Sequence, residues 1–75
     1  MEFEFDKIKM IFKSVMGESI EINEEIGKDN LEQWDSINHL NLIIELEDQL
    51  GIAFTKDEIE NIKTVKQLMK VLEVK

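Results

Sequence analysis

The 75-residue chain has no cysteine and no proline, and its only glycines are Gly17, Gly27 and Gly51. Without cysteine, neither a disulfide framework nor a thiolate metal site can form. So few turn residues disfavour a β architecture with many tight turns and favour long helices. The length is near the lower limit for a core without disulfide or metal support, so we expect residues 1–75 to form a single domain.

Long apolar runs are also missing. No apolar stretch approaches the roughly 20 residues that cross a bilayer as a helix. The first residues, Met-Glu-Phe-Glu-Phe-Asp, lack the basic and apolar regions of a signal peptide. The sequence therefore predicts a cytoplasmic protein without membrane insertion.

Arginine is absent as well, and the net charge is −8, from 17 Asp and Glu against nine Lys. Seven of these acids lie in residues 17–35, where Lys28 is the single base. Such a surface repels nucleic acid and attracts basic protein surfaces over long range. The simpler alternative, that the acids only keep a small domain soluble, stays open.

Apolar residues spaced three and four apart predict the two main helices. The first covers about residues 3–16 and ends at Gly17, and the second covers residues 36–50 and ends at Gly51. Between them the periodicity fails. A loop of this length is rare in a compact domain unless it is packed or functional, and its five large apolar side chains indicate that it is packed.

Two capping-box patterns predict the remaining helices. Thr55-Lys-Asp-Glu58 starts a short helix over about residues 56–62, and Thr64-Val-Lys-Gln67 starts a longer one over about residues 64–73. The fold class is therefore all-α, a bundle of three long helices and one short helix.

The second predicted helix is more apolar than one buried face requires. Its core stripe consists of five residues: His39, Leu42, Ile43, Leu46 and Leu50. Ile37, Leu40 and Ile44 form an apolar shoulder beside this stripe. The shoulder is either covered by the long loop or exposed for a partner, and the sequence leaves both alternatives open.

The sequence contains no convincing pattern for catalysis by the chain itself or for metal binding. His39 is the only histidine, and residues 29–33 lack the alternating oxygen ligands of a calcium loop. Ser36 and His39 are three residues apart on one helix, but no oxyanion-binding group or orienting acid accompanies them. We therefore expect no enzymatic activity, and we interpret His39 as a half-buried packing residue.

Ser36 at the start of the second helix has two interpretations. The first is an N-cap, because a serine oxygen there accepts an otherwise unpaired backbone N–H. The second is an attachment point. A phosphodiester on this hydroxyl would lie beside unpaired N–H groups at the positive end of the helix dipole. Asp35 beside it could then ligate a cation held by a modifying enzyme.

Three segments together resemble acyl carrier proteins: Trp34-Asp35-Ser36-Ile37, the helix end from Glu45 to Ile52, and Thr64-Val65. The resemblance covers essentially the whole chain and implies an acyl-carrier-like four-helix bundle with one acyl carrier domain over residues 1–75. It implies that Ser36 bears 4′-phosphopantetheine, installed from coenzyme A by a magnesium-dependent phosphopantetheinyl transferase. The thiol of this arm would carry acyl groups as thioesters between partner enzymes.

The resemblance also implies roles for other residues. Asp35 belongs to the modification motif. Partner enzymes with basic docking patches, which load or transfer the acyl group, would contact Asp35, Ile37, Ile44, Glu47 and Asp48. The cleft that shelters an acyl chain would be lined by Leu46, Ile59 and Ile62. Such a carrier is a monomer and a substrate of its partners.

Some residues depart from the family pattern. Ile37 replaces the usual leucine, and Asn38 and Asn41 stand where carriers of fatty-acid synthesis often have acids. We therefore expect a carrier of a specialised bacterial pathway. Two alternatives stay open: an aminoacyl carrier (D-alanyl or peptidyl), although the Gly-Gly usual before a peptidyl carrier's serine is absent, and a non-covalent acidic interaction module.

Overall fold

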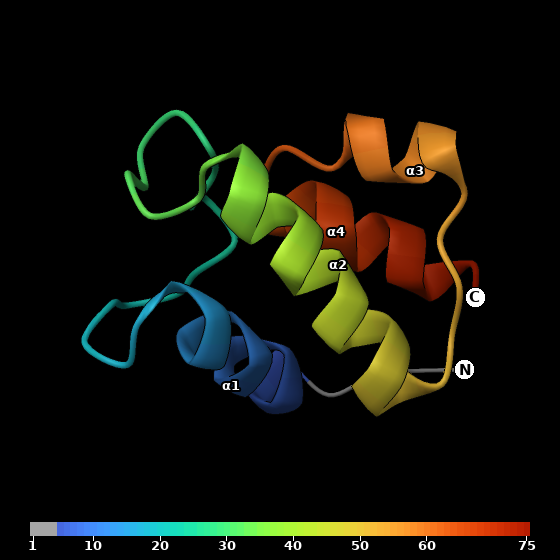
Figure 1. Cartoon of the computed structure of the whole chain (residues 1–75), viewed down its shortest axis with the longest axis horizontal. Helices are drawn as coiled ribbons and strands as arrows, with labels where there is room; N and C mark the ends of the chain where they lie inside the picture. Colours follow the sequence, from blue (N-terminus) through green and yellow to red (C-terminus); the bar gives the residue numbers. More distant parts are fainter. Residues whose placement is uncertain (1–4) are drawn as a thin grey trace.

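The computed structural model describes residues 5–75, which form a bundle of four helices (Figure 1). The helices are α1 (Phe5–Met16), α2 (Ser36–Leu50), α3 (Lys56–Asn61) and α4 (Val65–Glu73). Within residues 5–75 the only β pairing is an isolated bridge between Gly27 and Thr64. The predicted all-α fold is confirmed. Residues 3 and 4, which the sequence places in the first helix, lie outside the described residues.

Helix α2 packs against α1, and α4 lies behind α2 in Figure 1. The apolar residues of α1 that recur at helical spacing are buried, namely Ile8, Ile11, Phe12 and Met16. Helix α2 ends at Gly51, whose left-handed backbone (φ 65°, ψ 38°) lets its N–H donate to the carbonyl of Glu47 at 3.0 Å. The predicted end of the second helix is therefore confirmed.

One of the two predicted capping boxes is complete. Thr55 Oγ1 accepts from the N–H of Glu58 at 3.1 Å, and Glu58 Oε1 accepts from the N–H of Thr55 at 2.9 Å. At the start of α4, Thr64 Oγ1 accepts from the N–H of Gln67, but Gln67 Oε1 accepts from the N–H of Lys63. The prediction of the second capping box is therefore half correct. The threonine arm forms, but the glutamine oxygen binds the N–H of the residue before the cap and not that of Thr64 itself.

The long loop between α1 and α2 is bound to the start of α4. The N–H of Lys28 donates to the carbonyl of Lys63 at 2.9 Å, and the N–H of Val65 donates to the carbonyl of Ile26 at 2.8 Å. Ile22, Leu31 and Trp34 of the loop are buried in the core. The prediction of a packed loop is confirmed. Hydrogen bonds to the start of α4 satisfy backbone polar groups of the loop that have no partner in a helix or sheet of their own.

Trp34 is the largest buried side chain of the loop, with 2 % of its surface exposed. Its ring makes an edge-to-face contact with Phe12 of α1, with centroids 5.1 Å apart and an interplanar angle of 73°. This contact fixes the end of the loop in the core directly before α2 begins. No helix within residues 5–75 is long and apolar enough to span a membrane.

We expect Gly27→Ala to lower the free energy of unfolding by about 1–3 kcal/mol, because overpacking forces the backbone to shift. A Cβ at Gly27 would lie 2.8 Å from the carbonyl oxygen of Lys63 and 2.8 Å from Cγ2 of Thr64. Urea unfolding measures the change. Glu21→Ala, at an exposed position of the same loop, is the control and should change stability by less than about 0.5 kcal/mol. Equal losses in the two variants would contradict the close approach of loop and α4.

Candidate functional site

Asp35, and not Ser36, caps helix α2. The backbone of Asp35 is extended (φ −93°, ψ −175°), and its Oδ1 accepts from the N–H of Asn38 at 2.8 Å. Ser36 is the first residue inside the helix. The interpretation of Ser36 as the N-cap is therefore wrong. The carboxylate one residue earlier fills that role, where its charge also interacts favourably with the helix dipole.

The hydroxyl of Ser36 is left exposed and has no hydrogen-bond partner among residues 5–75. The backbone N–H groups of Ser36 and Ile37 also have no partner in this part of the chain. A hydroxyl therefore lies on the first helical turn beside two unpaired donors at the positive end of α2. A phosphodiester formed on this oxygen fits such a place, because the donors and the helix dipole both stabilise an anion.

Asn38 braces the segment that presents Ser36. Its side-chain amide donates to the carbonyl of Gln33 at 2.8 Å, while its backbone N–H donates to Asp35. Asn41 Nδ2 lies 3.4 Å from Oδ1 of Asn38 and extends the same network. From the sequence, these two asparagines were notable only because they stand where related carriers often have acids. In the structure they connect the loop to the first turns of α2.

A buried hydrogen bond between Trp34 and His39 connects the end of the loop to α2. Trp34 Nε1 donates to His39 Nδ1 at 2.9 Å, and His39 Nε2 lies 2.7 Å from the carbonyl oxygen of Ile59 in α3. An indole N–H can only donate and a backbone carbonyl can only accept, so His39 is held as the neutral tautomer with its proton on Nε2.

His39 is only 6 % exposed, so the expectation that it is half-buried underestimated its burial. The interpretation as a packing residue also missed its two hydrogen bonds. Burial lowers the pKa of His39, and the positive charge of Lys28 lowers it further, while the bond to Ile59 opposes this shift. The sequence pattern did not predict the partners of His39. Trp34 lies before the helix and Ile59 lies in another helix, so neither is spaced three or four residues from His39 on the same helix face.

An exposed apolar stripe runs along α2 away from Ser36. Ile37, Leu40 and Ile44 are 73 %, 56 % and 61 % exposed. The loop does not cover this shoulder, so the first of the two alternatives for it is excluded. Asp48 continues the stripe one turn further and is exposed as well. Leu40 is an exposed member of this stripe that the family resemblance did not single out.

The other predicted site residues are less accessible. Glu47 is half-buried, and its Oε2 accepts from the N–H of Phe54 at 2.9 Å, which ties α2 to the segment before α3. Leu46 and Ile62 are fully buried, and Ile59 is half-buried. These three residues lie in or against the core cluster.

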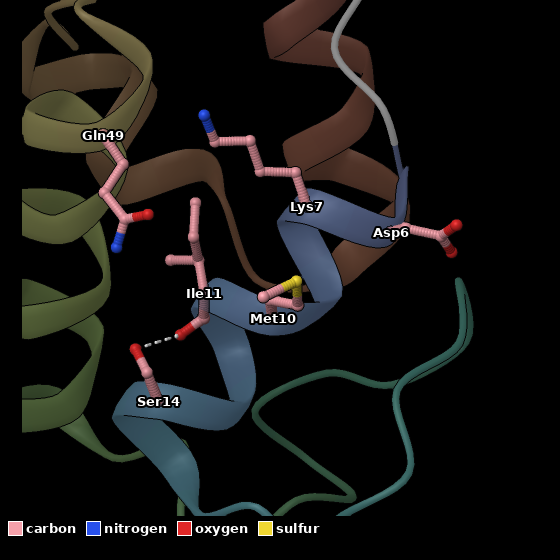
Figure 2. Close-up of a pocket in the computed structure, with 6 residues that line it drawn as sticks. All are labelled: Asp6, Lys7, Met10, Ile11, Ser14 and Gln49. Atoms are coloured by element: carbon pink, nitrogen blue, oxygen red, sulfur yellow. Dashed lines mark hydrogen bonds between the residues drawn. The ribbon is translucent and has the colours of Figure 1, made fainter.

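An open hollow of about 410 Å³ lies away from Ser36, between α1 and the C-terminal end of α2 (Figure 2). Its lining consists of Asp6, Lys7, Met10, Ile11, Ser14 and Gln49. Gln49 is about 20 Å along the helix from Ser36, at 1.5 Å per residue. The hollow is therefore separate from the candidate site. In the described part of the chain, no group of three or more His, Cys, Asp or Glu side chains is placed to bind a metal ion.

Comparison with known proteins agrees with this geometry. Residues 6–72 match the protein family described as phosphopantetheine attachment site. The chain belongs to this family. A solved structure from Mycobacterium tuberculosis, described as an acyl carrier protein, is similar over 92 % of this chain and 93 % of that one, with a TM-score of 0.83 and 26 % sequence identity. No curated protein sequence matches the chain.

These matches confirm the resemblance to acyl carrier proteins, the acyl-carrier-like helical bundle and 4′-phosphopantetheine as the cofactor. The chain is thus a carrier protein, of the class that phosphopantetheinyl transferases modify and acyl-handling enzymes use.

We expect Asp35→Ala to lower the free energy of unfolding by about 0.5–2 kcal/mol, because the N–H of Asn38 loses its acceptor. Asp35→Asn should retain most of the stability, since an amide oxygen also accepts at an N-cap. Ser36→Ala should change it by less than about 0.5 kcal/mol, because the hydroxyl has no partner. Urea unfolding of the three variants measures this. A loss in Ser36→Ala as large as in Asp35→Ala would contradict the assignment of the cap.

Proposed function

We propose that residues 1–75 are a single acyl carrier domain in which Ser36 bears 4′-phosphopantetheine through a phosphodiester. The observation that carries this proposal is the exposed hydroxyl of Ser36, which has no partner among residues 5–75 because Asp35 takes the capping role. The match to the attachment-site family spans this position. The arm supplies a thiol that holds acyl groups as thioesters, and the chain has no cysteine to compete with it.

The surroundings of Ser36 suit a substrate of a modifying enzyme better than a nucleophile. Both ring nitrogens of His39 are bound, to Trp34 and to Ile59, so no imidazole is available as a base for Ser36. Asp35 lies beside the hydroxyl and is exposed, which fits its place in the modification motif and as a ligand for the magnesium of the transferase.

The exposed stripe Ile37, Leu40 and Ile44 is the docking face of this proposal. Asp35 at one end and Asp48 at the other give the face a negative charge, which attracts the basic patches of a transferase and of acyl-loading and acyl-transferring enzymes. Glu47 contributes to this field from its half-buried place. An acyl chain would insert between α2 and α3, against Leu46, Ile59 and Ile62, which pack in or against the core cluster.

The pathway we propose is a specialised bacterial one in the cytoplasm, in which the chain acts as a monomer. Asn38 and Asn41 support this, because their amides brace the loop and leave the half of α2 nearest Ser36 without the acids that partners of general fatty-acid carriers meet. The similarity to a structure described as an acyl carrier protein favours acyl over aminoacyl cargo.

We expect co-expression with a promiscuous phosphopantetheinyl transferase to raise the intact mass by one phosphopantetheine group. Ser36→Ala should abolish the increase, because it removes the only oxygen proposed for attachment. Ser19→Ala, which removes another exposed hydroxyl, is the matched control and should be modified fully. Intact-mass spectrometry decides. An unmodified wild-type protein, or a mass increase that survives Ser36→Ala, would refute the proposal.

We also expect Leu40→Ser to lower kcat/KM for modification of the purified apo protein about tenfold, the effect of removing one apolar contact worth roughly 1.4 kcal/mol in a docked complex. Met10→Ser is the matched control, because Met10 is 70 % exposed on α1 and lies outside the docking face. Circular dichroism verifies that both variants are folded. Equal kcat/KM values for Leu40→Ser and Met10→Ser would show that the transferase does not use the stripe.

A further inference from the structure

Helix α3 is held to the rest of the protein by few interactions. It has six residues, and none of them is buried. The buried residues nearest to it are Phe54 before the helix and Ile62 after it. Two polar side-chain contacts connect α3 to other elements in the described structure: His39 Nε2 with the carbonyl of Ile59 at 2.7 Å, and Lys75 Nζ with Oε1 of Glu58 at 2.8 Å.

The contact made by His39 depends on its protonation state. Neutral His39 accepts from Trp34 at Nδ1 and donates to Ile59 at Nε2. A proton bound at Nδ1 would create a second N–H directed at the indole N–H, with the two nitrogens 2.9 Å apart. Two donors cannot satisfy each other, and the new charge would be buried. The imidazolium therefore cannot remain in this place with both contacts.

The charged groups around His39 do not compensate for such a cation. Lys28 of the loop is positive and opposes it. The carboxylate of Asp35 is exposed at the cap of α2 and makes no ion pair with the ring, and Glu58 of α3 is paired with Lys75. Glu60 of α3 is exposed, and no carboxylate within residues 5–75 has an oxygen within 4.0 Å of either ring nitrogen.

We propose that His39 is a proton-operated latch: the neutral ring ties α3 to Trp34 and the start of α2, and its protonation releases α3 while α1, α2 and α4 remain folded. The core that remains is substantial, because the buried residues of the helices belong to α1, α2 and α4. Release leaves the segment before Ser36 without its connection to α3.

The direction of the pH dependence follows from the lowered pKa of His39 in the latched form. In the released form the ring is in water, where its pKa is about 6.5. Between these two values release takes up one proton, so the released population rises about tenfold for each pH unit of acidification. Above about pH 6.5 release is independent of pH. Lys75 and the N–H of Thr55 lower the pKa of Glu58, so this second contact persists until more acidic pH.

Hydrogen-exchange protection in the ¹⁵N-labelled full chain tests the latch between about pH 7.5 and pH 5. The amides of Ile59 and Ile62 report on α3, since they donate to the carbonyls of Thr55 and Glu58. We expect their protection to fall about tenfold per pH unit below about pH 6.5, while the amide of Leu46 in α2 keeps its protection. Equal loss at Leu46 would indicate global unfolding, and constant protection in α3 while His39 titrates would also refute the latch.

His39→Gln is the matched control. One amide side chain can accept from Trp34 and donate to Ile59, but it does not titrate in this range. We expect its α3 to stay protected at every pH, whereas in His39→Leu, which makes neither bond, α3 should be unprotected throughout. A pH-dependent loss in His39→Gln equal to that of the wild type would overturn the proposal. Should neither variant fold, the ¹⁵N shifts of the wild-type ring decide, because their midpoint must coincide with that of α3 release.

Discussion

The rest of the structure depends on the contacts that the buried Trp34 side chain makes in the core. Its ring packs on Phe12 of α1, and its N–H binds His39, which in turn reaches the carbonyl of Ile59 in α3. The end of the loop, α1 and α2 therefore meet at the indole of Trp34, and His39 connects it to α3. Because Trp34 is fixed in the core, the chain must emerge at Asp35, and Ser36 necessarily lies on the surface.

The division of roles between Asp35 and Ser36 follows from this geometry. Both residues are good N-caps, and only one of them can lie at the last extended position before the helix. With Trp34 held below, that position falls to Asp35, whose carboxylate binds the N–H of Asn38. Ser36 then begins the helix with its oxygen unbound. A hydroxyl needed for capping would cost helix stability when modified, whereas this hydroxyl is available without such a cost.

Local sequence patterns predicted the helices well because their determinants lie three or four residues apart. Apolar periodicity located α1 and α2, and Gly51 and the Thr55 capping box located ends that the structure confirms. The failures have non-local or competing causes. The loop binds α4 through backbone bonds such as Val65 to Ile26, which no local pattern indicates. The cap at Ser36 was mistaken because a neighbouring carboxylate competes for it, and the role of His39 depends on a residue 20 positions away.

We interpret the exposed stripe of α2 as a surface that becomes buried in a complex. A chain of 75 residues has little apolar area to spare, and burying one large aliphatic side chain is worth about 1.5–3 kcal/mol. Ile37, Leu40 and Ile44 nevertheless remain exposed, and they follow one another along α2 beginning next to Ser36. Single exposed apolar residues such as Met10 need no explanation, but a contiguous row beside an unbound hydroxyl does. In the proposed function, an enzyme that reaches Ser36 lies against this row, so we interpret attachment and docking as two uses of one helix face.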